Sequence, residues 1–168
     1  TLGPLNEELE ASRRLAGSVV ASRYLRGHLV DHGFDPLRIH VAPLFARPPR
    51  ALVVPRDAHR LAFVGQLVRG KGVDILLHAM ARLGEDARLT IAGSGAQEAE
   101  LKALALKLGL GHRVLFAGHL KGLDRDRVVA SAAAVVMPSR APETFGLSGL
   151  EALRHATPVV AARVGGIP

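Results

Sequence analysis

The chain has 168 residues, 48% of them hydrophobic, and a formal net charge of +7. This hydrophobic content excludes a disordered chain, and the absence of cysteine excludes a disulfide framework and a thiolate metal site. The basic excess is spread along the sequence and only 4% of the residues are aromatic, so we expect no nucleic-acid-binding surface.

The first 45 residues are predicted to form two helices and two short strands. In chain order these are a helix at 6–15, a strand at 18–21, a helix from 22 to about 32, and a strand at 39–42. Ser22 can cap the second helix and Gly33 can end it. His28 and His32 lie one helical turn apart, but no third ligand is evident, so we expect no zinc site.

Residues 46–60 are rich in proline and arginine and show no hydrophobic period. We interpret them as a linker without secondary structure, followed by a strand that begins at Leu61. From there strands and helices alternate, which is typical of a parallel sheet with helices on both faces. The expected strands are 61–64, 88–92, 113–117, 133–137 and 158–161, and the expected helices are 72–83, 96–108, 124–132 and 145–155.

Two glycine-rich loops follow the first two strands of this set. The segment 65–72 has the Gly-x4-Gly-Lys spacing of a P-loop, but Gly72 stands where a serine or threonine would hold magnesium. A glycine turn, a helix start and Lys71 still make a site for a diphosphate. The loop 93–95 begins like a dinucleotide fingerprint, but Glu98 replaces its third glycine and the loop follows the second strand, so NAD is not expected.

The segment 138–153 carries the most informative chemical pattern. The apolar run 132–137 indicates a buried strand, and helical spacing begins at Phe145, so Glu143 lies on a loop at the carboxyl end of a strand. Glu151 follows about two turns into the helix. Ligands of open parallel sheets bind at this edge, where a helix start attracts phosphate and carboxylates accept bonds from hydroxyl groups. The pattern predicts a nucleotide-sugar, and an ordinary strand–loop–helix unit with solvated glutamates is the alternative.

This segment resembles the E-x7-E element of GT-B glycosyltransferases of the glycosyltransferase family 4 group. The shared features are a Pro-Ser strand end, Glu-x-Phe-Gly-Leu from Glu143, and Leu-Glu-Ala around Glu151. The resemblance continues with Pro-Val-Val-Ala at 158–161 and a glycine pair at 165–166. Residues 22–43 resemble the family's crossing region, where the amino-terminal domain leads into the carboxyl-terminal one.

The resemblance implies a Rossmann-like nucleotide-sugar-binding domain at 61–168, truncated at its end, with residues 1–45 as the tail of the acceptor-side domain. Glu143 would hold sugar hydroxyls, Glu151 the ribose, and Lys71 the diphosphate, with Glu143 and Lys71 as the catalytic residues. The remaining residues implied at the donor site are Gly65, Gln66, Arg69, Gly95, Gly118, His119, Leu120, Phe145, Gly146 and Leu147. Gln66 departs from the family, which has an arginine there, and Arg69 is the nearest substitute.

The implied activity is the retaining transfer of a sugar from a nucleoside-diphosphate sugar to a hydroxyl acceptor, without a metal or cofactor. The acceptor class, whether glycan, lipid or small molecule, stays open. So do a sugar-nucleotide epimerase on the same fold and a non-catalytic nucleotide-sugar-binding protein, the latter because Gln66 brings no charge. We expect residues 1–168 alone to be inactive and the whole protein to be cytoplasmic, with a peripheral contact to the inner membrane face left open.

Overall fold

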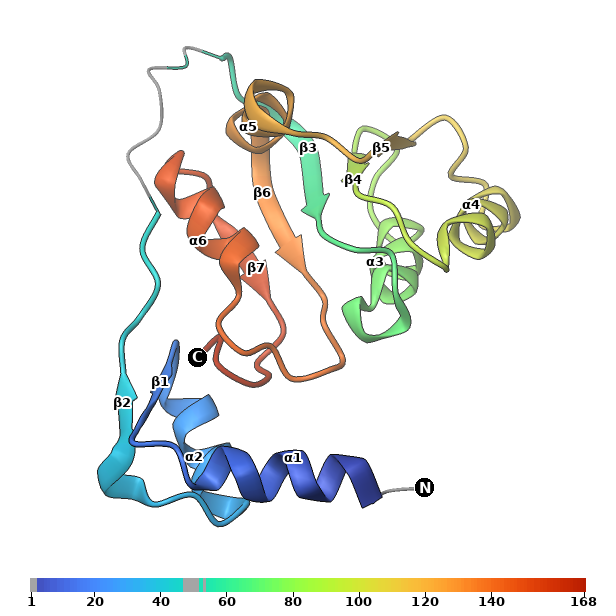
Figure 1. The fold of residues 1–168 in the computed structure, drawn as a ribbon. Helices are drawn as coiled ribbons and strands as arrows, with labels where there is room; N and C mark the ends of the chain where they lie inside the picture. The colour runs from blue at the N-terminus through green and yellow to red at the C-terminus, as the bar shows by residue number, and fades with distance from the viewer. Residues whose placement is uncertain (1–2, 47–51, 53) are drawn as a thin grey trace.

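The computed structural model describes residues 3–46, 52 and 54–168, which form a small amino-terminal unit and a larger sheet (Figure 1). Part of the predicted linker, residues 47–51 and 53, lies outside the described residues. Within the described part of the chain, no helix is both long enough and apolar enough to cross a bilayer.

Two helices and a two-stranded parallel sheet make up the amino-terminal unit. They are α1 (Gly3–Arg13), β1 (Ser18–Val20), α2 (Arg23–Asp31) and β2 (Ile39–Val41), with a 3-10 turn at Pro36–Arg38 before β2. The predicted order of elements is confirmed here, although α1 begins and ends earlier than predicted. Ser22 caps α2 as expected, because its hydroxyl accepts a bond from the amide of Leu25 at 3.2 Å.

Five parallel strands form the larger sheet in the order β5-β4-β3-β6-β7. The strands are β3 (Asp57–Val64), β4 (Arg88–Ala92), β5 (Val114–Gly118), β6 (Ala132–Met137) and β7 (Val159–Ala161). The helices between them are α3 (Val73–Met80), α4 (Glu98–Lys107), α5 (Gly122–Ser131) and α6 (Leu147–Arg154). This confirms the predicted α/β fold. The strand order reverses between β3 and β6, the place where open sheets bind their ligands.

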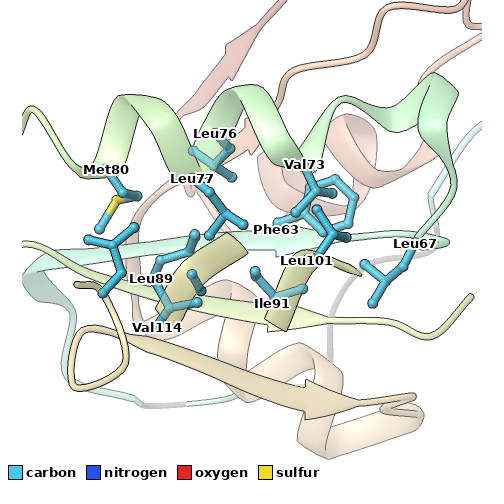
Figure 2. Packing of buried hydrophobic residues seen from close by; sticks show 12 residues of the cluster. Phe63, Leu67, Val73, Leu76, Leu77, Met80, Leu89, Ile91, Leu101 and Val114 are labelled. Atoms are coloured by element: carbon cyan, nitrogen blue, oxygen red, sulfur yellow. The ribbon is translucent and has the colours of Figure 1, made fainter. Parts of the chain in front are cut away.

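Helices cover both faces of this sheet, and on each face an apolar core lies between the sheet and its helices. On one face α3 and α4 pack on Phe63, Leu89 and Ile91, which are 3% exposed or less (Figure 2). On the other face α5 and α6 pack around Ala62 and Val135, which are fully buried. Ala62 and Phe63 are neighbours in β3 and point to opposite faces, as the two-residue period of a strand requires. Burial on both faces explains the continuous apolar runs of the central strands.

The strands β3 and β5 begin at different residues from those predicted. β3 begins at Asp57 rather than Leu61, so the last four residues of the predicted linker belong to a strand. Three of these four residues are polar and none is buried, which is why no apolar pattern marks them. β5 begins at Val114, because Arg113 belongs to a turn in which its amide donates to the carbonyl oxygen of Leu110 at 2.9 Å. The side chain of Arg113 is buried. Its guanidinium donates to the carbonyl oxygens of Met80, Leu83, Gly84 and Ala87.

The helix α6 also begins later than predicted, at Leu147 instead of Phe145. Gly146 precedes it with a φ of +84°, a left-handed conformation that a helix cannot contain. Phe145 therefore lies on the loop. Glu151 lies in the second turn of α6, nearer to the helix start than the predicted two full turns.

Candidate functional site

Two adjoining hollows, each of about 350 Å³, open at the carboxyl ends of the strands. The first hollow lies over the ends of β3, β4 and β5, and its lining includes Gly93, Ser94, His119 and Leu120. The second hollow lies beside the start of α6, and its lining includes Lys71, Glu143, Gly146, Leu147 and Glu151. Both hollows share the residues Val64, Gly65, Gln66 and Arg125. The site is therefore a two-part hollow at the sheet edge where ligands were expected.

Lys71 and Glu143 meet in the second hollow, although 72 residues separate them in the sequence. The Lys71 ammonium lies 2.6 Å from Glu143 Oε1, and the Ser139 hydroxyl donates to the same oxygen at 2.6 Å. Burial alone would raise the pKa of Glu143, but the bonds from Lys71 and Ser139 outweigh burial and hold this pKa below its ordinary 4.5. Glu143 is thus ionised at neutral pH and only 14% exposed, which makes it a fixed acceptor for hydroxyl groups.

The loops that carry these two side chains are fastened to each other. Arg140 forms a two-bond ion pair with Asp74, with both distances 2.6 Å, and the bonds from Arg140 lower the pKa of Asp74. The amides of Arg140 and Ala141 both donate to the carbonyl oxygen of Gly70, at 2.8 and 3.0 Å. The distance between Lys71 and Glu143 is therefore set by backbone contacts as well as by their own attraction.

Gly72 shows why the segment 65–72 is not a P-loop, although it has the P-loop spacing. Its φ is +66°, and a Cβ added to it would stand 2.1 Å from the carbonyl oxygen of Pro138. A serine or threonine at this position would collide with the loop after β6, so the magnesium-binding hydroxyl of a P-loop has no room. The glycine serves the packing of two loops.

The glycines of the loop 93–95 also serve loop packing. A Cβ on Gly93 would stand 1.8 Å from the carbonyl oxygen of Gly65, and one on Gly95 would stand 2.5 Å from that of Leu67. The amide of Leu67 donates to the backbone carbonyl oxygen of Ser94 at 2.9 Å. These contacts hold the ends of β3 and β4 together beside the first hollow. Loop packing therefore explains why positions 93 and 95 are glycines, and no bound dinucleotide is needed to explain them.

Glu151, the second predicted glutamate, forms an ion pair. Its Oε1 lies 2.9 Å from the guanidinium of Arg125, which comes from α5. Glu151 is half-buried and lines the second hollow, and Arg125 lines both hollows. Each of the two glutamates thus has its own cation before any ligand is bound.

Four other residues of the predicted donor site lie away from the hollows. Arg69 is exposed and lines neither of them. Gly95 and Gly118 line neither hollow, although the carbonyl oxygen of Gly118 accepts a bond from the amide of Gly93 at 2.7 Å. Phe145 lines a separate apolar hollow of about 490 Å³ between α6 and β7. The structure therefore brings together Lys71, Glu143, Glu151, Gln66, Gly65, Gly146, Leu147, His119 and Leu120.

The amino-terminal unit touches the site through Ser22. Its hydroxyl donates to the carbonyl oxygen of Thr144 at 2.5 Å, one residue after Glu143. The imidazole pair at 28 and 32 lies elsewhere, and His32 Nδ1 is 2.7 Å from the carbonyl oxygen of His28. Among the described residues, no three histidine, aspartate or glutamate side chains gather as metal ligands.

The sequence profile of the family described as "Glycosyl transferases group 1" matches residues 48–168. The chain belongs to this family. The match covers the whole larger sheet and both hollows, so the resemblance drawn from the E-x7-E segment is confirmed at the level of the family.

Curated relatives of this group 1 glycosyl transferase support the same assignment. An uncharacterized glycosyltransferase of Methanocaldococcus jannaschii is 40% identical over 120 residues, which cover 70% of this chain and 30% of the relative. The D-inositol 3-phosphate glycosyltransferase of Frankia alni is 37% identical over 185 residues, which cover 96% of this chain and 44% of the relative. The chain therefore spans less than half the length of these relatives.

Solved structures of low sequence identity share the fold. Anabaena HepE in complex with UDP and glucose superimposes with a TM-score of 0.87 at 22% identity, over 99% of this chain and 50% of HepE. TarM of S. aureus superimposes with a TM-score of 0.81 at 20% identity, over 93% of this chain and 31% of TarM. The group 1 glycosyl transferase chain thus has the GT-B type of fold.

Arg125 is the charged site residue of this group 1 glycosyl transferase that sequence reasoning missed. It lies near the start of a helix among other charged residues, where a solvated face is the usual interpretation. One signal could have found it: α5 follows His119 and Leu120, so its first turn lies at the ligand-binding edge of the sheet.

Proposed function

We propose that this group 1 glycosyl transferase moves a sugar from a nucleoside-diphosphate sugar to a hydroxyl acceptor, with retention of the anomeric configuration, as part of family 4. The observation that carries the proposal is the two-part hollow, in which an ionised Glu143 and Lys71 lie beside the start of α6. Structures of HepE in complex with UDP and glucose, and with UDP-glucose, support a nucleotide-sugar donor. Relatives named D-inositol 3-phosphate glycosyltransferase support a hydroxyl acceptor.

The shape of the site suggests how such a donor would bind. The nucleoside would lie in the first hollow, where the segment at His119 and Leu120 offers backbone groups to a base. The sugar would lie in the second hollow, with its hydroxyl groups donating to Glu143. Glu151 would accept bonds from the ribose, and the amides at Gly146 and Leu147 would donate to phosphate oxygens at the helix start.

In the reaction the bond between the anomeric carbon and the diphosphate oxygen breaks, and the acceptor oxygen bonds to the same face of that carbon. The proton of the acceptor hydroxyl passes to the departing diphosphate oxygen. Negative charge grows on the departing diphosphate. Lys71 and the amides at the start of α6 are placed to stabilise this charge, so we propose that no metal takes part. The acceptor-side domain, of which residues 1–45 would be the tail, would deliver the hydroxyl group.

A non-catalytic nucleotide-sugar-binding protein is the second candidate. It is favoured by Gln66, an uncharged residue that lines both hollows at the position where the family resemblance places an arginine. A site with one cation fewer would stabilise the departing diphosphate less. This candidate predicts binding without turnover.

The test is to incubate the full-length protein with UDP-, GDP- and ADP-glucose and a polyol acceptor, and to follow the anomeric protons by NMR. We expect release of a nucleoside diphosphate and a glycoside with the donor's anomeric configuration. Lys71→Ala should abolish the reaction, and Lys121→Ala, which removes a lysine outside both hollows, should not. An inverted glycoside would contradict retention, an isomerised donor would indicate the epimerase, and binding without product would indicate the non-catalytic protein.

A further inference from the structure

Arg125 lies where the two hollows meet. It is the fourth residue of α5 and lines both hollows, together with Val64, Gly65 and Gln66. Its guanidinium is 2.9 Å from Glu151, and 34% of its side chain is exposed. A ligand that passes from one hollow to the other would therefore reach this guanidinium.

The phosphates of a nucleoside-diphosphate sugar stand between its two ends. With the nucleoside in the first hollow and the sugar in the second, the diphosphate crosses the junction. Of the four described residues that line both hollows, Arg125 alone is charged. Gln66 can donate hydrogen bonds there but brings no charge. A guanidinium binds phosphate through two parallel bonds and keeps its proton, so it suits this place.

We propose that Arg125 binds the diphosphate of the donor and supplies the positive charge that Gln66 lacks. This inference rests on the proposed function, because it takes the ligand of the two hollows to be a nucleotide-sugar. In the free protein, Lys71 pairs with Glu143 and Arg125 with Glu151, so the four side chains together carry no net charge. A diphosphate that draws Arg125 away from Glu151 also frees this carboxylate for the ribose hydroxyls.

The neighbouring arginines do not fit this role. Arg69, in the loop after β3, is exposed and lines neither hollow. Arg127 follows Arg125 on the same helix, but its side chain is 61% exposed and pairs with Asp124 at 3.2 Å. Arg127 therefore provides a matched control, since its removal takes the same charge from the same helix outside the site.

The test is a double-mutant cycle in the full-length protein, read by calorimetric titration with UDP, GDP and ADP. We expect Arg125→Gln to weaken binding of the nucleoside diphosphate at least about tenfold, because a bond to a charged group is lost. In the protein that keeps Arg125, Gln66→Arg should tighten binding by less than about fivefold, because a positive charge is already present there. In the Arg125→Gln background the same change should tighten binding by at least about tenfold. Arg127→Gln should change nothing.

Each other outcome overturns a defined part of the account. Equal gains from Gln66→Arg in both backgrounds, or an unchanged affinity of Arg125→Gln, would show that Arg125 does not bind the diphosphate. Arg125→Gln must also be measured in a Glu151→Gln background. If it has no effect there, Arg125 only neutralises Glu151, and the assignment is wrong. Absence of binding by the unaltered protein would instead reject the nucleotide-sugar site as a whole.

Discussion

At the scale of single residues, the two glutamates of the site differ in their surroundings. Glu143 is held from two sides, by Lys71 and Ser139, in the part of the site that faces the start of α6. Glu151 also lines the second hollow, but it has one cation, Arg125, which lines the first hollow as well. These positions assign Glu143 to the sugar and Glu151 to the nucleotide in our proposal.

The two assignments predict different effects of truncation. Glu151→Ala should weaken binding of the bare nucleoside diphosphate and of the donor alike, because the ribose is common to both. Glu143→Ala should leave the bare diphosphate nearly unchanged and reduce turnover. A lost hydrogen bond to a charged group costs about 1.5–3 kcal/mol, so each loss should be at least about tenfold. Titration with the diphosphate and turnover of the donor measure the two effects.

Both variants must first keep the melting temperature of the unaltered protein. Equal losses of diphosphate affinity in the two variants would refute the division of roles. If neither variant loses binding or turnover, Glu143 and Glu151 are only a solvated helix face without a role in the site.

The lowered pKa of Glu143 predicts a pH dependence of stability. A carboxylate whose pKa is lower in the folded than in the unfolded protein adds stability above its ordinary pKa, and this stability disappears as the pH falls through the folded value. The melting temperatures of the protein and of Glu143→Gln should therefore differ by a constant amount from neutral pH down to the ordinary value of 4.5. Below it the difference should shrink. Glu7→Gln, at an exposed position of α1, is the control variant that removes the same charge away from the site. A difference that widens in acid would contradict the pairing of Glu143 with Lys71.

At the scale of elements, the site depends on two loops that pack backbone to backbone, one after β3 and one after β6. The carbonyl oxygen of Gly70 accepts hydrogen bonds from two backbone amides of the second loop. A side chain at position 72 would collide with that loop, so only glycine fits there. The contacts place the end of one strand against the end of its neighbour, so the pairing of Lys71 and Glu143 follows from the order of strands in the sheet.

A pair of glycine substitutions separates this packing from backbone strain. Gly72 and Gly109 have similar φ angles of +66° and +71°, but only Gly72 would bring its Cβ against another loop. Gly109→Ala should cost about 1–2 kcal/mol for the left-handed conformation. Gly72→Ala should cost more, lower the melting temperature further, and weaken nucleoside diphosphate binding. Thermal unfolding and titration of the two variants measure this, and equal effects of both would show that the loop contact is unimportant.

The sequence predicts the elements better than the contacts between them. The strands β4 and β6 and the order of helices follow from apolar runs and glycine positions, which are local signals. The polar start of β3 and the role of Arg113 could not be predicted, because both depend on groups far away in the chain. The same holds for the site: the E-x7-E spacing locates Glu143 and Glu151, whereas the pairing of Glu151 with Arg125 needs the packing of α5 against α6.

At the scale of the whole molecule, our proposal makes this chain the donor half of a two-domain enzyme. The profile match begins at residue 48, after the amino-terminal unit, and the chain spans less than half the length of the M. jannaschii and F. alni relatives. Ser22 joins the amino-terminal unit to the loop that carries Glu143. In our proposal this contact lies on the acceptor side of the site.

The most direct measurement of the central claim is a calorimetric titration of the full-length protein with UDP, GDP and ADP. We predict that at least one of them binds with a stoichiometry of one to one, and that Lys71→Ala and Glu151→Ala each weaken this binding at least about tenfold. The contradicting result would be that none of the three binds, or that both variants bind as tightly as the unaltered protein. The two hollows would then not be a nucleotide-sugar site.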